Sequence, residues 1–130
     1  MVTLAEVAEA WKQLGFGNTI RGNNPKNNME YFLSCTDKFN INYHIHLLTY
    51  DNGKAKLKSP PEDNVDLMTN IFNETDALEV ATILFYKAGY HTNNYCKKNE
   101  VFNNDYKIKY LKYKNKYLEL KNILKKNNQN

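Results

Sequence analysis

The sequence has few cysteines, prolines, glycines and arginines, and it has no long apolar run. Its 130 residues include two cysteines, three prolines, five glycines and a single arginine, Arg21. Two cysteines are too few for a disulfide framework, so we expect Cys35 and Cys96 to be reduced thiols. The absence of a run of about 18 apolar residues argues against a membrane-spanning helix. Residues 1–16 carry neither the basic segment nor the apolar segment of a signal peptide.

Charge is unevenly distributed along the chain. Residues 1–100 hold 10 Lys and Arg against 12 Asp and Glu, a net charge of −2. Residues 101–130 hold 8 lysines and 2 acids, a net charge of +6, so the C-terminal segment alone makes the whole chain basic. A basic segment beside a near-neutral body indicates an acidic partner. We therefore divide the chain into a globular domain, residues 1–100, and a basic amphipathic helix with a frayed end, residues 101–130.

Two helices are predicted in the globular domain. Over Thr3–Leu14 the sequence combines a capping box with an apolar stripe, and Gly15 stands at the position expected just after the helix. Over Asp76–Ala88 the residues are apolar around most of the helix circumference, which is typical of a central core helix. Gly89 is expected to end this second helix.

Alternating apolar and polar residues between these helices predict an antiparallel sheet of three or more strands. The strands are expected within residues 29–34, 40–50 and 54–58. Asp51-Asn52-Gly53 is typical of a type I′ hairpin turn. One face of the middle strand should point inward, and it comprises Ile41, Tyr43, Ile45 and Leu47. The fold class is therefore α+β, with the sheet packed by two helices and followed by a long basic helix.

Three other segments carry weaker patterns. Gly15–Asn28 is rich in glycine and asparagine and is expected to be a polar loop. Val65–Phe72 is short and apolar, and one or two helical turns are expected there. Tyr90–Phe102 is compatible with either a strand or a coil.

The candidate chemical groups do not form a recognisable site. His44 and His46 share one face of a strand and could bind zinc together with His91 and Cys96. The simpler interpretation is that both histidines lie on the solvated face, and no CxxC or HxxxH spacing supports a metal. Cys96 precedes two lysines and would be the more reactive thiol. No nucleophile, phosphate-loop or paired-carboxylate motif is present, so we expect no catalytic residues, metal or cofactor.

The C-terminal segment carries the clearest pattern in the chain. From Asn104 to about Lys125 a long helix is predicted, and its apolar and aromatic residues follow a spacing of 4, 3, 4, 3, 4. This spacing is a heptad seam, and its members are the candidate partner-binding residues Tyr106, Tyr110, Tyr113, Tyr117, Leu120 and Leu124. Beside the seam lie the candidate nucleic-acid-binding residues Lys107, Lys109, Lys114, Lys116 and Lys121.

Three interpretations of this helix remain open. The seam can dock on the protein's own body, it can bind another protein chain, or its tyrosines and lysines can meet nucleic acid through bases and phosphates. A parallel, in-register homodimer is disfavoured because it would place lysine beside lysine. With one arginine in the chain, any nucleic-acid binding should be salt-sensitive and weakly sequence-specific.

The stretch YLKYKNKYLELKNIL resembles the Tyr-, Lys- and Leu-rich C-terminal helices found on otherwise unrelated proteins of giant DNA viruses, the mimivirus group especially. The resemblance covers about 20 residues and implies an origin rather than an activity. It also implies a location in host cytoplasm, a viral factory or the virion. We therefore expect a non-catalytic viral accessory or structural protein that acts through protein contacts or oligomerisation of its C-terminal helix. The alternative is sequence-nonspecific nucleic-acid binding by the Lys/Tyr stripe.

Overall fold

A computed structural model describes residues 1–23, 29–59, 63–96 and 105–116. The elements follow in this order: α1 (Leu4–Gln13), β1 (Thr19–Asn23), β2 (Met29–Thr36), β3 (Asn42–Leu48), β4 (Lys54–Ser59), β5 (Asp63–Thr69), the 3-10 helix η1 (Ile71–Asn73) and α2 (Ala77–Thr92). Residues 105–116 form a further helix.

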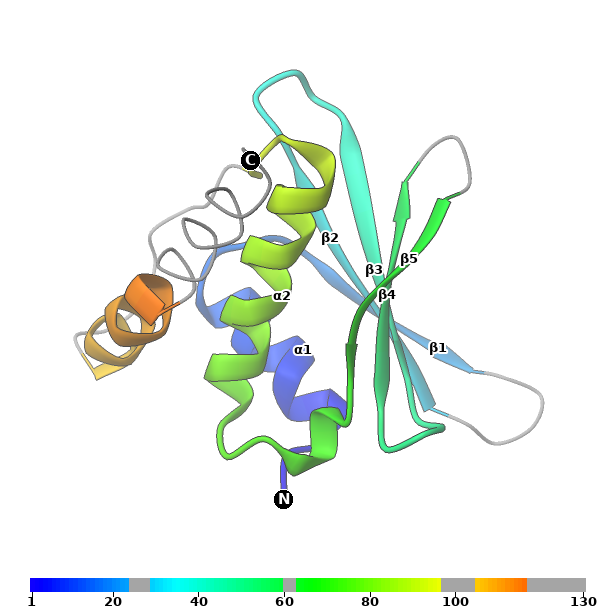
Figure 1. The fold of residues 1–130 in the computed structure, drawn as a ribbon, viewed down its shortest axis with the longest axis vertical. Coiled ribbons are helices and arrows are strands. Elements are labelled where there is room, and N and C mark those ends of the chain that lie inside the picture. Colours follow the sequence, from blue (N-terminus) through cyan, green and yellow to red (C-terminus); the bar gives the residue numbers. More distant parts are fainter. Residues whose placement is uncertain (24–28, 60–62, 97–104, 117–130) are drawn as a thin grey trace, which may run out of the picture.

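The five strands form one antiparallel sheet in the order β1-β2-β3-β4-β5, so each strand pairs with its neighbour in sequence. Helices α1 and α2 pack against each other on one face of this sheet (Figure 1). The prediction of an α+β fold with an antiparallel sheet of three or more strands and two covering helices is confirmed.

Helix α1 follows the sequence prediction closely. The Thr3 side chain accepts a hydrogen bond from the Glu6 amide, and the Glu6 carboxylate accepts one from the Thr3 amide, which completes the capping box. Gly15 adopts a left-handed φ of 74° just beyond the helix. Trp11 is fully buried, and its indole Nε1 donates to the Ser34 carbonyl at 3.1 Å. This bond joins α1 to the strand beneath it.

The turn between β3 and β4 is also as predicted. The Gly53 amide donates to the Tyr50 carbonyl at 3.1 Å, and the two residues between them, Asp51 and Asn52, both have positive φ. Positive φ at both central positions defines a type I′ turn, which matches the twist of the flanking strands.

The inward face of β3 is confirmed at three of its four predicted positions. Tyr43, Ile45 and Leu47 are buried in the core. Ile41 is 44% exposed because it precedes the strand and belongs to the β2–β3 turn. On the opposite face, His46 is 9% exposed instead of solvated. Its ring stacks on Phe32 of β2 with ring centroids 4.4 Å apart, so the prediction of a solvated His46 was wrong.

Strand β1 occupies part of the segment expected to be a polar loop. Residues 19–23 pair in antiparallel register with β2, opposite residues 29–33. An edge strand is held mainly by backbone hydrogen bonds on one side and does not require an apolar alternation. The largest apolar side chain of β1, Ile20, is accordingly 64% exposed.

Strand β5 replaces most of the helical turns expected over residues 65–72. A β-bulge between Ala55 and Lys56 changes the register, so that Ala55 pairs with Met68 whereas Lys56 pairs with Asp66. Leu67 is the extra residue of the bulge, and its presence interrupts the period-two alternation. The resulting run of apolar residues resembled a helix in the sequence. Lys87 of α2 donates a 2.8 Å hydrogen bond from its Nζ to the Leu67 carbonyl.

Helix α2 begins as predicted but continues past Gly89. Asp76 caps it by accepting a hydrogen bond from the Leu78 amide at 2.9 Å, and the helix ends at a left-handed Asn93 with φ of 57°. A β-carbon at Gly89 would collide with the Tyr95 ring, so glycine is required there for close packing. The predicted helix end at Gly89 was therefore wrong.

The two cysteines are not free thiols. Cys35, near the end of β2, forms a disulfide with Cys96, and their Cα atoms are 5.6 Å apart. Cys96 also forms an isolated antiparallel bridge with Asp37. Both the reduced state predicted for these residues and the reactive thiol considered at Cys96 were wrong. A count of cysteines carries no information on whether two of them meet in the fold.

Candidate functional site

The helix of residues 105–116 lies beside α2 (Figure 1). Its tyrosine side faces the body, because Tyr110 bonds to Tyr86 and Tyr113 bonds to Asp76. Tyr110 is buried at 2% exposure, and Tyr106 and Tyr113 are half-buried against the core. The seam predicted from heptad spacing is therefore a contact with the protein's own body at these three positions. The remaining seam residues Tyr117, Leu120 and Leu124, and Lys121 beside them, lie outside the described residues, as does the rest of the long helix expected there.

Tyr110 is the central contact of this helix. Its ring meets Phe16 edge-on with ring centroids 5.8 Å apart, and its hydroxyl shares a 2.9 Å hydrogen bond with that of Tyr86 on α2. Burial raises the pKa of Tyr86 far above its ordinary value, and the Tyr110 hydroxyl adds to this effect. A tyrosine can lie in such a position because its ring packs and its hydroxyl finds a partner.

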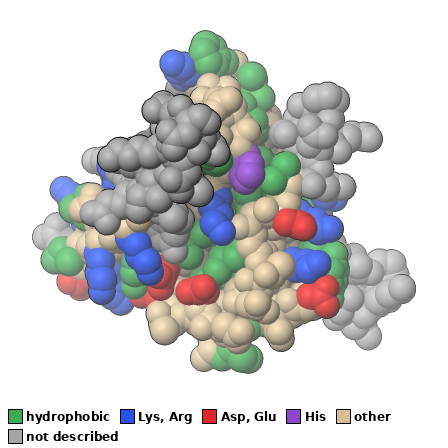
Figure 2. Space-filling model, in the orientation of Figure 1, with side chains coloured by type: hydrophobic (Ala, Val, Ile, Leu, Met, Phe, Trp, Pro, Cys, Tyr) green, Lys and Arg blue, Asp and Glu red, His purple; other side chains and the backbone are tan. Residues whose placement is uncertain are grey.

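Acidic groups at the start of α2 anchor the middle and the C-terminal end of the docked helix. Asp76 accepts a 3.2 Å hydrogen bond from the Tyr113 hydroxyl and lies 3.6 Å from the Lys109 ammonium group. The Glu79 carboxylate lies 3.2 Å from the Lys116 ammonium group. Figure 2 shows lysine and acidic side chains side by side in this region, at the lower left of the view. Two of the lysines proposed to bind nucleic acid are therefore ion-paired to the body.

The outward side of the helix carries exposed apolar residues between lysines. Ile108 is 70% exposed and Leu111 is 42% exposed. Lys107 and Lys112 are also exposed, whereas Lys114 is half-buried with its Nζ 6.0 Å from the centre of the Tyr110 ring. Two large apolar side chains at i and i+3 on a helix form a small contact surface. The sequence pattern did not single out this side because the tyrosine seam was stronger.

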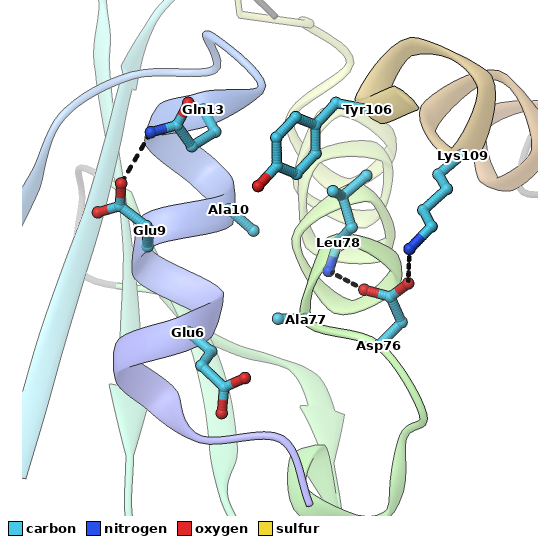
Figure 3. Close-up of a pocket in the computed structure, with 9 residues that line it drawn as sticks. All are labelled: Glu6, Glu9, Ala10, Gln13, Asp76, Ala77, Leu78, Tyr106 and Lys109. Atoms are coloured by element: carbon cyan, nitrogen blue, oxygen red, sulfur yellow. Dashed lines mark hydrogen bonds and ion pairs between the residues drawn. The ribbon is translucent and has the colours of Figure 1, made fainter. Parts of the chain in front are cut away.

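A groove of about 320 Å³ lies between α1, the start of α2 and the docked helix (Figure 3). The Tyr106 side chain points into the space between α1 and α2, and Ala10, Ala77 and Leu78 contribute apolar surface. Its charged lining residues are Glu6, Glu9, Asp76 and Lys109. Three acids against one lysine give the lining a formal net charge of −2.

This groove could not be read from the sequence, because three segments far apart in the chain form it. A partial signal was present in α1, where Glu6 and Glu9 lie on the polar side of an amphipathic helix. Nothing local indicated that the basic C-terminal helix would supply the opposite wall. The groove exists in this form because the tyrosine contacts fix Tyr106 and Lys109 beside α2.

No protein-family model and no curated protein matches the sequence, and no solved structure matches the chain.

The described residues contain no group of three or more His, Cys, Asp or Glu side chains placed to hold a metal ion. Cys96 is bonded to Cys35, so neither thiol is available as a ligand or a nucleophile while the disulfide is intact. Within the part of the chain that the structure describes, no helix has the length and apolar character needed to cross a bilayer.

Alkaline pH should loosen the docked helix through Tyr113. Burial raises the pKa of Tyr113 to about 12, and the negative charge of Asp76, the hydrogen bond to it and the charge of Glu79 act in the same direction. Because the folded pKa is above the unfolded value, the stabilising contribution is complete below about pH 10 and is lost as pH rises toward about 12. A 12-residue helix melts when it undocks, so the circular dichroism helix signal should fall over this range.

The matched control for this titration is Tyr113→Phe, which keeps the ring and removes the ionisable hydroxyl. Lysine side chains in general also lose charge in this range, but they do so in both proteins. The expected result is a larger loss of helix signal in the wild type than in Tyr113→Phe. Parallel losses in the two proteins would show that Tyr113 ionisation does not control docking.

Proposed function

We propose that this chain is a non-catalytic accessory or structural protein that works through protein–protein contact, in the first instance with its own copies. The observation that carries the proposal is the 2% exposure of Tyr110, which fixes the helix of residues 105–116 to the body. A fixed helix presents Ile108 and Leu111 to solvent without the entropy loss of ordering a free peptide on binding. The helix then acts as part of a rigid surface and not as one helix of an intermolecular coiled coil.

The internal use of the tyrosine seam supports this form of contact. A coiled-coil dimer through the seam would have to remove Tyr106, Tyr110 and Tyr113 from the body. It would also break the Tyr86 hydrogen bond and the Asp76 and Glu79 ion pairs. The outward side of the helix, with Ile108 and Leu111 exposed, needs no such rearrangement.

A viral origin is supported by the resemblance of the C-terminal helix to those of giant DNA viruses. Among host cytoplasm, viral factory and virion, we propose the virion. The Cys35–Cys96 disulfide supports this choice, because disulfides persist at virion surfaces and are rare in the reducing cytosol.

Light scattering of the full chain and of a chain ending at Asn104, at about 50 and about 500 mM salt, tests the proposal. The expected result is a full-length oligomer at both salts and a monomer after truncation, because apolar contacts tolerate salt. A circular dichroism spectrum of the truncated chain checks that the body remains folded. A full-length protein that is monomeric at micromolar concentration contradicts self-association.

Electrostatic nucleic-acid binding is the second candidate function. Lys107 and Lys112 are exposed on the outward side of the helix and favour it. Among the described residues of this helix, however, Tyr110 is buried and Tyr106 and Tyr113 are half-buried against the core, which disfavours base stacking. Phosphate contacts by a few lysines lose affinity steeply as salt rises. In the same measurement, a mass shift with a duplex or single-stranded oligonucleotide at low salt only, abolished by truncation, would favour this candidate over self-association.

A further inference from the structure

The turn between β2 and β3 displays two large apolar side chains at its tip. Phe39 is 62% exposed and Ile41 is 44% exposed, and the Lys38 ammonium group lies 5.1 Å from the centre of the Phe39 ring. Turns usually carry polar residues at such positions. We call Lys38–Ile41 the hairpin tip. An exposed aromatic ring with a cation beside it is the kind of anchor that dominates protein interfaces.

The backbone of the hairpin tip is held from beneath by a fully buried carboxylate. Asp37 is 0% exposed, and its Oδ1 accepts hydrogen bonds from the Phe39 amide at 2.8 Å and the Ile41 amide at 3.0 Å. Its Oδ2 accepts a bond from the Tyr43 hydroxyl at 3.1 Å, and Asn40 closes the turn with a left-handed φ of 62°. The tip is therefore ordered before any partner arrives, which lowers the entropy cost of binding.

The disulfide adds a second support beside the tip. Cys35 lies two residues before Asp37, and Cys96 pairs with Asp37 in a β-bridge. The residues just after α2 are thereby linked to the end of β2, at the base of the hairpin, by the disulfide and by the bridge. The backbone that carries Phe39 is therefore rigid. Among the described residues, the Phe39 ring contacts Lys38, and this contact does not explain why an apolar side chain is exposed here.

The groove between α1 and the docked helix is complementary to the hairpin tip in both apolar surface and charge. Its surface includes Ala10, Ala77, Leu78 and the Tyr106 ring, and its volume of about 320 Å³ is large enough for one aromatic side chain. Its lining carries a net charge of −2, opposite in sign to that of Lys38. Glu9 is exposed at the rim, where it accepts a hydrogen bond from Gln13 and keeps a carboxylate oxygen for a cation.

We propose that the hairpin tip of one copy docks in this groove of a second copy, with Phe39 on the apolar surface and Lys38 beside Glu9. The inference rests on the proposed self-association and adds a second contact to the exposed side of the helix at Ile108 and Leu111. The tip lies at the top of Figure 1, whereas the groove lies beside the start of α2, toward the opposite end of the long axis. A chain therefore cannot fill its own groove, and the occupant must come from another copy.

The separation of the two surfaces limits the assemblies that can form. Two antiparallel copies can make the contact twice and close a dimer, whereas a repeated head-to-tail contact builds a longer chain or a ring. One tip alone buries much less area than a stable interface requires, so the doubled contact is the more stable arrangement. Truncation at Asn104 removes Tyr106 and Lys109, so it removes one wall of the groove together with the outward helix surface.

Phe39→Ser is the direct test, because it removes the anchor without altering the buried Asp37 network. It should raise the dissociation constant of the full-chain oligomer at least about tenfold in sedimentation velocity. The chain offers a matched control in Tyr50→Ser. Tyr50 is 45% exposed on the β3–β4 turn and has the Lys54 ammonium group 5.9 Å from its ring centre. Because this turn lies outside the proposed contact, Tyr50→Ser should leave the dissociation constant unchanged.

A charge exchange tests the pairing of tip with groove. Lys38→Glu and Glu9→Lys should each weaken association, and the double variant should recover most of the loss because the opposite charges are restored. Wild-type association in Phe39→Ser, with truncation still giving a monomer, would overturn the tip-to-groove contact and leave the proposed function intact. Additive losses without recovery in the double variant would also overturn it. Only a monomeric wild type removes both proposals together.

Discussion

Reduction of the Cys35–Cys96 disulfide should lower the free energy of unfolding by about 4 kcal/mol. The two cysteines are 61 residues apart in sequence, so the crosslink closes a long loop and restricts the unfolded chain strongly. For a domain of this size the midpoint of thermal unfolding should fall by about 15 °C. Differential scanning calorimetry of the oxidised and reduced protein measures both quantities.

A double variant with alanine at both cysteines supplies the control. Added reductant should leave its unfolding temperature unchanged, and the oxidised wild type should have no titratable thiol in its native state. Two reactive thiols in the native, unreduced protein would contradict the disulfide. Equal stability of the reduced and oxidised forms would instead contradict the loop-closure argument.

Tyr110→Ala should reduce the free energy of unfolding by about 3 kcal/mol, at the lower end of the range for truncating a buried aromatic residue. The loss has an upper bound, because the helix of residues 105–116 can leave the body instead of enclosing a cavity. Hydrogen exchange should accordingly become fast in this helix while the sheet remains protected. Urea unfolding followed by the fluorescence of Trp11, the only tryptophan in the chain, gives the global value.

Tyr110→Phe separates packing from hydrogen bonding at the same position. It keeps the ring against Phe16 and removes the hydroxyl bonded to Tyr86, so a loss of about 1 kcal/mol is expected. If Tyr110→Ala were no more destabilising than Tyr110→Phe, the ring would contribute nothing to docking. That outcome would contradict the buried position of Tyr110.

The sequence predicted those elements whose signals are local. The capping box of Thr3 and Glu6 with Gly15 after the helix determined α1, and Asp51-Asn52-Gly53 determined the β3–β4 turn. Each of these signals lies within a few residues and depends on backbone conformation alone. The α+β class followed because such signals alternate along the chain in the order helix, strands, helix.

The errors occurred where a distant partner decides the structure. In the sequence Gly89 indicates the end of a helix, but its actual role is to leave room for the Tyr95 ring. The bulge at Leu67 depends on how β4 and β5 align. The disulfide requires Cys35 and Cys96 to meet across 61 residues. None of these contacts has a periodicity that a sequence pattern can show.

The candidate site was predictable to the same extent. Heptad spacing identified Tyr106, Tyr110 and Tyr113 as one contact side, and these residues do share a contact surface. The spacing could not identify the surface they meet, since an internal docking helix and an intermolecular zipper present the same seam. The groove is visible only once α1, the start of α2 and residues 105–116 are placed together.

The order of strands in the sheet has a consequence for how the molecule forms during synthesis. Because each strand pairs with the one just before it, the sheet requires only short-range contacts and can form as the chain emerges from the ribosome. Residues 105–116 emerge after the sheet and after α1 and α2, and Tyr106 and Lys109 of this segment complete the groove. A nascent chain that has not yet extended to residues 105–116 therefore carries a hairpin tip but lacks the complete groove. Two chains that both lack residues 105–116 would be unable to make this contact, which protects neighbouring nascent chains on one messenger RNA from premature association with each other.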